Sequence, residues 1–287
     1  MREIVVVSGK GGTGKTSLIA SFAVLAGEPL VVGDCDVDAA NLALLLPGTR
    51  EREEAFYGGR RARIDEAKCI MCAECSTACR FRAIEFGKRV PPFVDELSCE
   101  GCGACALVCP EDAIDFTPRR SGTVYLSRTD VGPLVHAALG IAEDNSGKLV
   151  ARVRELARAT AEENDSMLVL LDGPPGIGCP VHASLSGVDK VVAVTEPTPS
   201  GLHDLERLLE LCRHFKLQTK VIINKYDLDL ALANRIETAT HEYGAEPIGR
   251  IPFDERVPQA LANGETPLMV LPVGKSLAES WSKIIES

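Results

Sequence analysis

The sequence predicts an α/β protein built on a doubly wound, mostly parallel sheet, with a smaller α+β domain inserted into it. Continuous apolar runs of strand length recur along the 287 residues, as expected for strands buried on both faces. Amphipathic stretches with apolar residues three and four apart lie between these runs. The alternation stops between residues 61 and 119, where cysteines gather. This order of strands and helices is typical of a doubly wound sheet, and the interruption indicates an insertion.

The predicted strands and helices follow in order from this pattern. We expect strands at residues 3–7, 30–33, 167–171, 190–195, 220–223 and 247–251, and helices at 15–26, 148–162, 201–214 and 230–243. Near the C-terminus, residues 276–285 place Leu277, Trp281 and Ile284 on one helical face. This last stretch carries acidic as well as basic residues, so we expect it to pack on the core rather than bind a membrane.

Composition excludes several classes of protein. There are 31 Lys and Arg against 41 Asp and Glu, a net charge of -10, which repels phosphate backbones and anionic lipid. No apolar run reaches the length of a spanning helix, and the N-terminus shows no signal-peptide pattern. We therefore expect a soluble cytoplasmic protein whose partners include neither nucleic acid nor a membrane.

A phosphate-binding loop follows the first predicted strand. Residues 9–16 satisfy the pattern G-x-x-x-x-G-K-S/T between a strand and a helix. Glycine amides close around phosphate, Lys15 neutralises its charge, and the Thr16 hydroxyl is suited to ligate Mg²⁺. The pattern predicts an ATP/ADP and Mg²⁺ site. The candidate residues are Gly9, Lys10, Gly11, Gly12, Thr13, Gly14, Lys15, Thr16 and Ser17.

A second lysine within this loop, Lys10, gives the first resemblance to a known family. It matches the deviant Walker A signature of the MinD/ParA/Mrp group of P-loop ATPases, which includes the nitrogenase iron protein. In that group the signature lysine reaches across an ATP-bridged dimer to the partner's phosphates. The resemblance therefore implies that role for Lys10 and a homodimer that forms on ATP binding.

Two further segments resemble the switch regions of that group. Residues 34–42 look like switch I, D-x-D-x-x-x-x-N-L, in which Asp36 matches the carboxylate that orients the attacking water. Residues 168–176 look like Walker B and switch II, in which Asp172 lies on the Mg²⁺ side and Gly176 offers an amide to the γ-phosphate. The resemblance thus implies the catalytic residues Lys10, Lys15, Asp36 and Asp172, the Mg²⁺ residues Thr16, Asp36 and Asp172, and nucleotide contacts from Asn41, Asn224, Lys225, Pro252 and Phe253.

The cysteine-rich segment is an internal repeat with a period of 30 residues. Each half has the spacing C-x₂-C-x₂-C-x₃-C, and Pro110 completes the bacterial ferredoxin signature in the second half. Arg80 replaces the proline of the first half and, as a cation, is expected to raise the potential of the nearer cluster. Because the fourth cysteine of each run crosses to the other cluster, one 4Fe-4S cluster takes Cys69, Cys72, Cys75 and Cys109, and the other takes Cys99, Cys102, Cys105 and Cys79.

Zinc and disulfides are the alternatives for these eight cysteines. Zinc sites favour four ligands arranged as two C-x₂-C pairs, and the spacing of these eight cysteines does not divide into such pairs. Disulfides are typical of exported chains. Three cysteines lie elsewhere. We expect Cys35 and Cys212 to be small buried side chains, whereas Cys179, just after switch II, is either a structural thiol or a ligand at a dimer interface. Residues 145–148 are either a helix start or a partner contact.

From residue 4 to residue 271 the chain resembles MinD-superfamily P-loop ATPases with an inserted ferredoxin domain carrying two 4Fe-4S clusters. We expect residues 1–60 and 120–287 to form the ATPase domain and 61–119 the ferredoxin domain. The resemblance implies partners such as a second, paralogous ATPase and a small metal-cluster protein of the dinitrogenase cofactor or orange-protein type. It favours an ATPase that couples hydrolysis to electron transfer; the alternatives are a cluster carrier or assembly ATPase and a Min/Par-type positioning ATPase.

Overall fold

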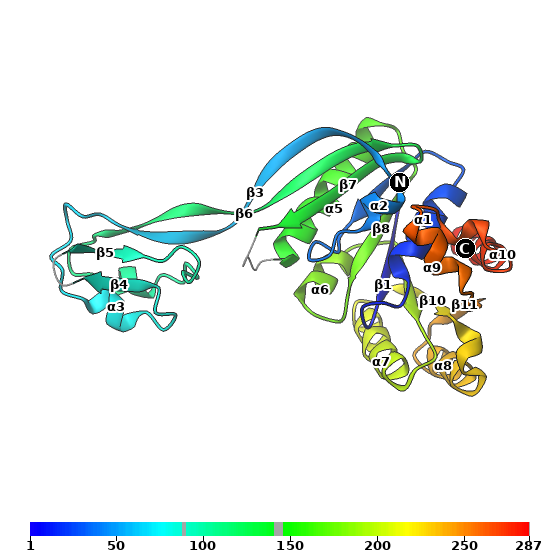
Figure 1. The fold of residues 1–287 in the computed structure, drawn as a ribbon. Helices are drawn as coiled ribbons and strands as arrows, with labels where there is room; N and C mark the ends of the chain where they lie inside the picture. The colour runs from blue at the N-terminus through cyan, green and yellow to red at the C-terminus, as the bar shows by residue number, and fades with distance from the viewer. Residues whose placement is uncertain (88–89, 141–145, 287) are drawn as a thin grey trace. The chain divides into compact units, whose positions relative to one another are not determined.

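The computed structural model describes residues 1–87, 90–140 and 146–286. The chain divides into two compact units, traced in Figure 1. The first consists of Met1–Glu54, Val124–Ala138 and Ser146–Ser287, and the second of Ala55–Thr123 and Leu139–Asn145. The eight cysteines of the internal repeat all belong to the second unit.

A large, mostly parallel sheet organises the described chain. Its strand order is β11-β10-β9-β1-β8-β2-β7-β6-β3, and parallel pairing links the neighbours from β11 to β7. The structure thus confirms the predicted α/β fold and all six predicted strands. The strands are β1 (Arg2–Ser8), β2 (Leu30–Asp34), β3 (Gly48–Ile64), β6 (Ile114–Thr129), β7 (Gly132–Leu139), β8 (Leu168–Pro175), β9 (Lys190–Thr195), β10 (Gln218–Asn224) and β11 (Glu246–Ile251).

Three strands at one edge, β7, β6 and β3, were not predicted from the sequence. The first residues of β3 alternate between Arg and Glu and are exposed, so they form no apolar run. β6 begins at Ile114, within the cysteine segment, where the sequence pattern indicated a break in regular structure. Edge strands with one face in water lack the continuous apolar pattern by which buried parallel strands are found.

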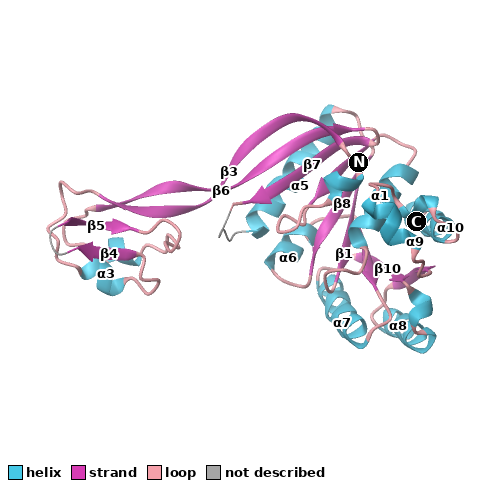
Figure 2. Cartoon of the chain, viewed as in Figure 1, coloured by secondary structure: helices cyan, strands magenta, loops and turns pink. Residues whose placement is uncertain are grey.

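Helices cover both faces of this sheet (Figure 2). Local signals set their starts: Thr198 accepts a hydrogen bond from the Gly201 amide at the start of one helix, and Asp229 accepts one from Leu232 at another. The helices are α1 (Lys15–Leu25), α2 (Leu42–Leu45), α5 (Ser146–Glu163), α6 (Cys179–Leu185), α7 (Pro199–His214), α8 (Leu230–Glu242), α9 (Arg256–Ala262) and α10 (Val273–Ile285), with 3₁₀ turns η1 (Tyr226–Leu228) and η2 (Pro267–Met269).

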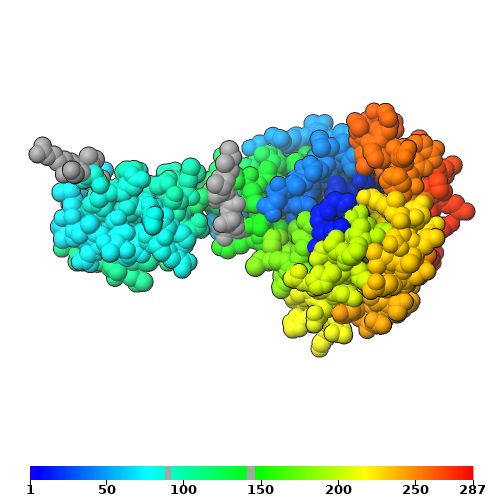
Figure 3. Space-filling view, turned by 60° about the horizontal axis from the view of Figure 1, so that its bottom comes forward, coloured from blue at the N-terminus to red at the C-terminus, as the bar shows by residue number. Residues whose placement is uncertain are grey.

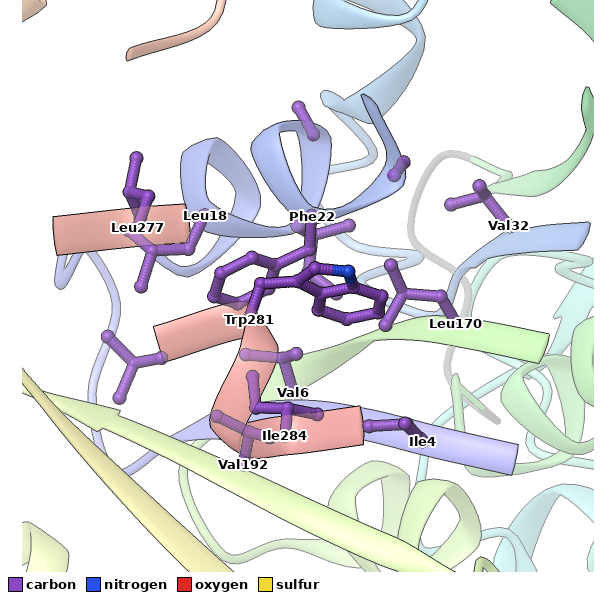
Figure 4. Close-up of a cluster of buried hydrophobic side chains, with 14 of the residues drawn as sticks. Ile4, Val6, Leu18, Phe22, Val32, Leu170, Val192, Leu277, Trp281 and Ile284 are labelled. Atoms are coloured by element: carbon purple, nitrogen blue, oxygen red, sulfur yellow. The ribbon is translucent and has the colours of Figure 1, made fainter. Parts of the chain in front are cut away.

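Helices α1 and α10 pack on one face of the sheet, over Ile4 and Val6 of β1. Figure 4 shows the centre of this packing, where the Trp281 ring stacks on Phe22 with centroids 5.3 Å apart. Trp281 is only 4% exposed. The C-terminal helix therefore packs on the core, as its mixed charge predicted. None of the helices in the described residues is long and apolar enough to cross a bilayer.

The second unit is a pair of interlocked halves. It contains an antiparallel pair, β4 (Ile84–Gly87) with β5 (Val90–Val94), and the short helices α3 (Glu74–Ala78) and α4 (Ala104–Leu107). The Asp65 amide donates to the Ala113 carbonyl at 2.8 Å, and the Asp95 amide donates to the Ala83 carbonyl at 2.7 Å. The two bonds are equivalent, because each joins the start of one half of the repeat to the matching alanine of the other half. Each half of the sequence repeat is thus completed by the other.

Candidate functional site

The phosphate loop joins β1 to α1 at the carboxyl edge of the sheet. Gly12 and Gly14 have φ values of 80° and 89°, a left-handed conformation that glycine adopts without strain. The Asn224 side chain, at the end of β10, donates to the Thr13 carbonyl at 2.8 Å. A Cβ on Gly14 would run into this same amide. Asn224 therefore supports the shape of the loop, and the glycine makes room for it.

A cavity of about 710 Å³ opens beside this loop, within the size range of small-ligand sites. In Figure 3 the blue N-terminal segment reaches the surface between yellow-green, orange and lighter blue segments. The far end of the cavity is apolar, with Val257 and Leu261 of α9 and Leu277 of α10. The predicted residues that line it are Gly11, Gly12, Thr13, Gly14, Lys15, Thr16, Ser17, Asp36, Asn41, Asn224, Lys225, Pro252 and Phe253.

Lys15 lies among three carboxylates. Its Nζ contacts the Asp172 carboxylate directly and lies 3.7 Å from that of Asp36. Burial lowers the pKa of Lys15, but the charges of Asp172, Asp36 and Asp34 outweigh it and raise that pKa above its ordinary value. The lysine is therefore a fixed positive charge at the loop, as a phosphate group requires.

The same carboxylates are crowded together in a buried site, which disfavours their charged forms. Burial and the nearby Asp172 raise the pKa of Asp34 to about 8, although the Leu42 and Asp36 amides donate to it. Burial also raises the pKa of Asp36. In the described residues, Asp172 Oδ2 and Thr13 Oγ1 are buried without a hydrogen-bond partner. Carboxylate and hydroxyl oxygens are the ligands that Mg²⁺ uses, so the unpartnered oxygen of Asp172 and the hydroxyl of Thr16 at the loop fit the ion.

Four predicted residues do not line the cavity: Gly9, Lys10, Asp172 and Gly176. Gly9 packs against the Asp204 backbone, leaving no space for a side chain. The Gly176 amide donates to the Ser8 carbonyl at 2.8 Å. For Gly176 to serve a γ-phosphate, as the resemblance implies, that bond has to open first.

Lys10 is held by Glu196, Thr198 and Ser200, residues for which the sequence predicted no role. Its Nζ lies 2.7 Å from the Glu196 carboxylate and donates to the hydroxyls of Thr198 at 3.1 Å and Ser200 at 3.2 Å. Lys225 lies 3.2 Å from the same carboxylate. Burial acts to raise the pKa of Glu196, but hydrogen bonds from both lysines hold it below the usual value. The one available signal was position, because Glu196 directly follows β9 at the edge where ligands bind.

The cysteines of the second unit line two small cavities. The first cavity contains Cys69, Cys72, Cys75 and Cys109, and the second contains Cys79, Cys99, Cys102 and Cys105. Each cavity thus brings together three cysteines of one run and the fourth of the other. None of the eight is in a disulfide.

The sulfur atoms of these cavities accept backbone hydrogen bonds. Ala83 donates to Cys79 at 3.4 Å, Ala113 to Cys109 at 3.3 Å, and Ala62 to Cys99 at 3.4 Å. Within the described residues, no group of three or more His, Cys, Asp or Glu could hold a single metal ion. In a 4Fe-4S cluster each iron takes one thiolate, so four sulfurs surround a cube rather than one ion. Four thiols around a cavity with amide donors to sulfur suit such a cluster.

The remaining cysteines differ in exposure. Cys35 and Cys212 are buried, and burial raises the pKa of Cys35 and brings that of Cys212 to about 11. Cys179 is exposed at the start of α6. Gly147 in the first turn of α5 lies so close that a Cβ there would be 3.4 Å from the Cys179 carbonyl oxygen. Of the predicted segment 145–148, Asn145 lies outside the described residues.

Comparison with known proteins gives a family match over most of the chain. The family model described as the CobQ/CobB/MinD/ParA nucleotide binding domain matches residues 4–268. The uncharacterized protein MJ0578 of Methanocaldococcus jannaschii is 35% identical over 91% of this chain and 88% of its own. A second protein of that organism, MJ0579, is 27% identical over 93% of this chain and 91% of its own.

Solved structures with this fold include two MinD proteins. The MinD chain matched in the MinC:MinD cell division protein complex of Aquifex aeolicus has a TM-score of 0.59 and 19% identity, covering 100% of this chain and 97% of that chain. MinD of Pyrococcus horikoshii, complexed with Mg-ADP, has a TM-score of 0.55 and 16% identity, covering 99% and 96%. At identities below 20%, these matches show that the chain shares the fold of the two MinD proteins.

Proposed function

The chain belongs to the family of CobQ/CobB/MinD/ParA nucleotide-binding domains, and we propose that it is an iron–sulfur ATPase. In this proposal it binds and hydrolyses ATP as a nucleotide-bridged dimer and couples this cycle to electron transfer through two 4Fe-4S clusters. The electron acceptor is a protein that holds a metal cofactor. One observation carries the proposal: a single chain combines a phosphate-loop cavity with two cavities lined by four cysteines each.

The nucleotide part of the proposal assigns tasks to Lys15, Thr16, Asp36 and Asp172. Lys15, fixed by Asp172 and Asp36, neutralises the phosphates. Asp36 would orient the attacking water. Thr16 and Asp172 would hold Mg²⁺, and the ion would supply positive charge to the phosphate oxygens. The buried, partnerless Asp172 Oδ2 supports this assignment, because a bound cation would satisfy it.

The dimer part of the proposal concerns Lys10. Its bonds to Glu196, Thr198 and Ser200 keep it within its own subunit. Closure of an ATP-bridged dimer would exchange these acceptors for phosphate oxygens of the partner subunit. The second subunit is another copy of this chain or a paralogue; two proteins similar to this chain in Methanocaldococcus jannaschii are in keeping with the second choice.

The redox part of the proposal assigns all eight cysteines of the repeat as ligands of the two clusters. Bound clusters supply one-electron chemistry, and the chain's own contribution is to hold them and set their potentials. Amides of Ala62, Ala83 and Ala113 donate to ligand sulfurs, which favours the reduced state. With four cysteines in each cavity, every iron would have a protein ligand, which suits electron transfer better than cluster delivery.

A cluster carrier or assembly ATPase is the second candidate, and the exposed Cys179 beside switch II favours it. A carrier should hold labile iron beyond the two resident clusters, and Cys179→Ala should remove it. A Min/Par-type positioning ATPase is the third candidate, in keeping with the MinD fold. That candidate predicts ATP-dependent sedimentation with liposomes or DNA, which the net charge of -10 opposes.

The test begins with protein purified without oxygen. We expect about eight iron and eight sulfide ions per chain, as two 4Fe-4S clusters require. The dithionite-reduced protein, freed of excess dithionite, should then reduce a one-electron dye faster with MgATP than with MgADP. The Lys15→Ala variant should keep its iron but lose the nucleotide effect. Equal dye reduction with both nucleotides would contradict the coupling, and a chain without iron would contradict the proposal as a whole.

A further inference from the structure

The 30-residue repeat allows the two cysteine cavities to be compared position by position. In the first cavity, Ile70 and Met71 separate the first two cysteines, and their counterparts in the second are Glu100 and Gly101. The residues before the fourth cysteine of each run differ in the same direction. Leu107 and Val108 precede Cys109 of the first cavity, whereas Thr77 and Ala78 precede Cys79 of the second.

Four apolar side chains that lie next to cysteines of the first cavity in the sequence are exposed, and one of them, Ile70, lines the cavity itself. Ile70 is 60% exposed, Met71 56%, Leu107 89% and Val108 37%. Ile70 lines the same cavity as Cys109, which directly follows Val108, and Cys72 of this cavity is itself exposed. Single exposed apolar side chains are ordinary, but four beside the cysteines of one cavity indicate an interaction site. We call these residues the apolar patch.

Four exposed acidic residues, which we call the acidic rim, flank the apolar patch along the sequence. They are Glu66, Glu74 at the start of α3, Glu111, which lines the first cavity, and Asp112. The one cation in residues 65–75 and 107–113, Lys68, lies 3.9 Å from the Asp65 carboxylate. An apolar centre with a charged rim is the usual anatomy of a protein interface.

Arginine side chains contact the lining of the second cavity. The Arg60 side chain donates to the Gly101 carbonyl at 3.2 Å, and its guanidinium lies 4.3 Å from the centre of the Phe116 ring. Arg119 donates to the Cys99 carbonyl at 2.9 Å. Gly101, Cys99 and Phe116 all line the second cavity. Two arginines therefore contact the lining of the second cavity, which also contains Glu100, whereas exposed apolar and acidic side chains flank the cysteines of the first.

The charge of the rim selects among possible occupants. An anionic lipid surface or a nucleic acid would be repelled by it. A second copy of this chain, docked rim to rim, would bring like charges together. A protein with an apolar patch surrounded by Lys and Arg satisfies both the centre and the rim.

We propose that the apolar patch docks a one-electron redox protein with a basic rim, and that electrons enter or leave the chain at the first cavity. The inference rests on the proposed function, because it requires clusters in the two cavities. In the outward direction, one electron leaves the reduced cluster and reduces the oxidised metal centre of the partner, with no bond formed or broken and no proton moved.

Cytochrome c tests the surface, because it is a basic protein and a one-electron acceptor. Its binding to the oxidised holoprotein is measured by calorimetry without oxygen, and its reduction by the reduced holoprotein is followed by stopped flow. Leu107→Ser and Glu111→Lys should each lower affinity and the second-order rate by about fivefold or more. The matched controls are Leu97→Ser, also at an exposed leucine, and Glu96→Lys, at an exposed glutamate that lines neither cavity. Both controls should stay within about twofold of the parent.

The outcomes separate the surface from the proposed function. Iron content and the visible spectrum of each variant establish that its clusters are intact, and Ile70→Ser replaces any variant that loses iron. Losses confined to Leu107→Ser and Glu111→Lys support the proposal. Equal losses in the controls, or no loss in any variant of an iron-loaded protein, overturn the docking surface and leave the proposed function standing. A parent chain without iron overturns both.

Discussion

The Nζ atom of Lys10 lies 2.7 Å from the carboxylate of Glu196, a residue 186 positions later in the chain. Thr198 and Ser200 accept further hydrogen bonds from the same amine. Lys10 is thus fully occupied within its own subunit. If it serves the phosphates of a second subunit, Glu196 is the group with which those phosphates compete.

Removing the negative charge of Glu196 should therefore favour the dimer. We expect Glu196→Gln to tighten MgATP-dependent dimerisation by about three- to tenfold, since one partly buried ion pair no longer holds the lysine. Sedimentation velocity, in an Asp36→Ala background that prevents turnover, measures it. Glu210→Gln, on the exposed side of α7, should leave the dimer constant unchanged. An unchanged or weaker dimer in Glu196→Gln would show that the pair does not restrain Lys10.

Lys15→Ala should abolish nucleotide binding. Of the two lysines in the loop, Lys15 is the one that lines the cavity, so the substitution removes the positive charge that would face the phosphates. We expect ATP affinity to fall by about 100-fold or more, the scale of charge-assisted hydrogen bonds to phosphate. Titration with a fluorescent ATP analogue measures it, with Lys10→Ala as the matched control. That control should bind ATP within about threefold of the parent as a monomer. Unchanged affinity in Lys15→Ala would mean that the nucleotide binds elsewhere.

The crossing of the fourth cysteines predicts which cluster each substitution damages. Cys109→Ser should disturb the cluster of Cys69, Cys72 and Cys75, whereas Cys79→Ser should disturb that of Cys99, Cys102 and Cys105. EPR spectra of the reduced variants distinguish the two clusters. Cys75→Ser and Cys105→Ser supply the reference spectrum for each loss. If Cys109→Ser instead matched Cys105→Ser, the two runs would ligate separately.

His136 predicts a dependence of stability on pH. Its ring stacks on Tyr125 with centroids 5.0 Å apart and lies 3.4 Å from the Ser127 hydroxyl. Burial, and then the positive charge of Arg50, lower the pKa of His136. Below its ordinary pKa of about 6.5 the unfolded chain binds a proton that the folded chain does not. The neutral His136 side chain therefore contributes to the free energy of unfolding above pH 6.5, and this contribution is lost as the pH falls below 6.5.

Urea unfolding at pH 7.5 and pH 5.5 checks this sign. The parent should lose more unfolding free energy between the two pH values than His136→Gln, which cannot take up the proton. His241→Gln, on α8, serves as the control. An equal loss in the parent and in His136→Gln would remove His136 as the cause.

The central sheet could be predicted because its strands are buried on both faces. Runs such as Ile4 to Val7 are continuous and apolar, and the structure places these residues at 0–2% exposure. The polar start of β3 has no such pattern, so its pairing could not be seen. The same reasoning explains the C-terminal helix, whose apolar face around Trp281 has one plausible destination, the core.

The phosphate loop and the cysteines could be located in the sequence because their ligands lie close together in it. Spacing alone indicates which residues can surround one phosphate or one cluster. Glu196 could not be assigned a role, because its partner Lys10 is brought to it by the strand order β9-β1, which single-sequence patterns do not reveal. The Gly176 bond to Ser8 is likewise a property of this conformation.

The central claim is that the nucleotide state and the clusters are energetically coupled. EPR-monitored redox titration without oxygen measures both cluster potentials, first in MgADP and then in MgATP, using Asp36→Ala to prevent turnover. The account predicts a shift of about 60 mV in at least one cluster, roughly 1.4 kcal/mol for one electron. Identical potentials in the two nucleotides would contradict coupling within the protein alone.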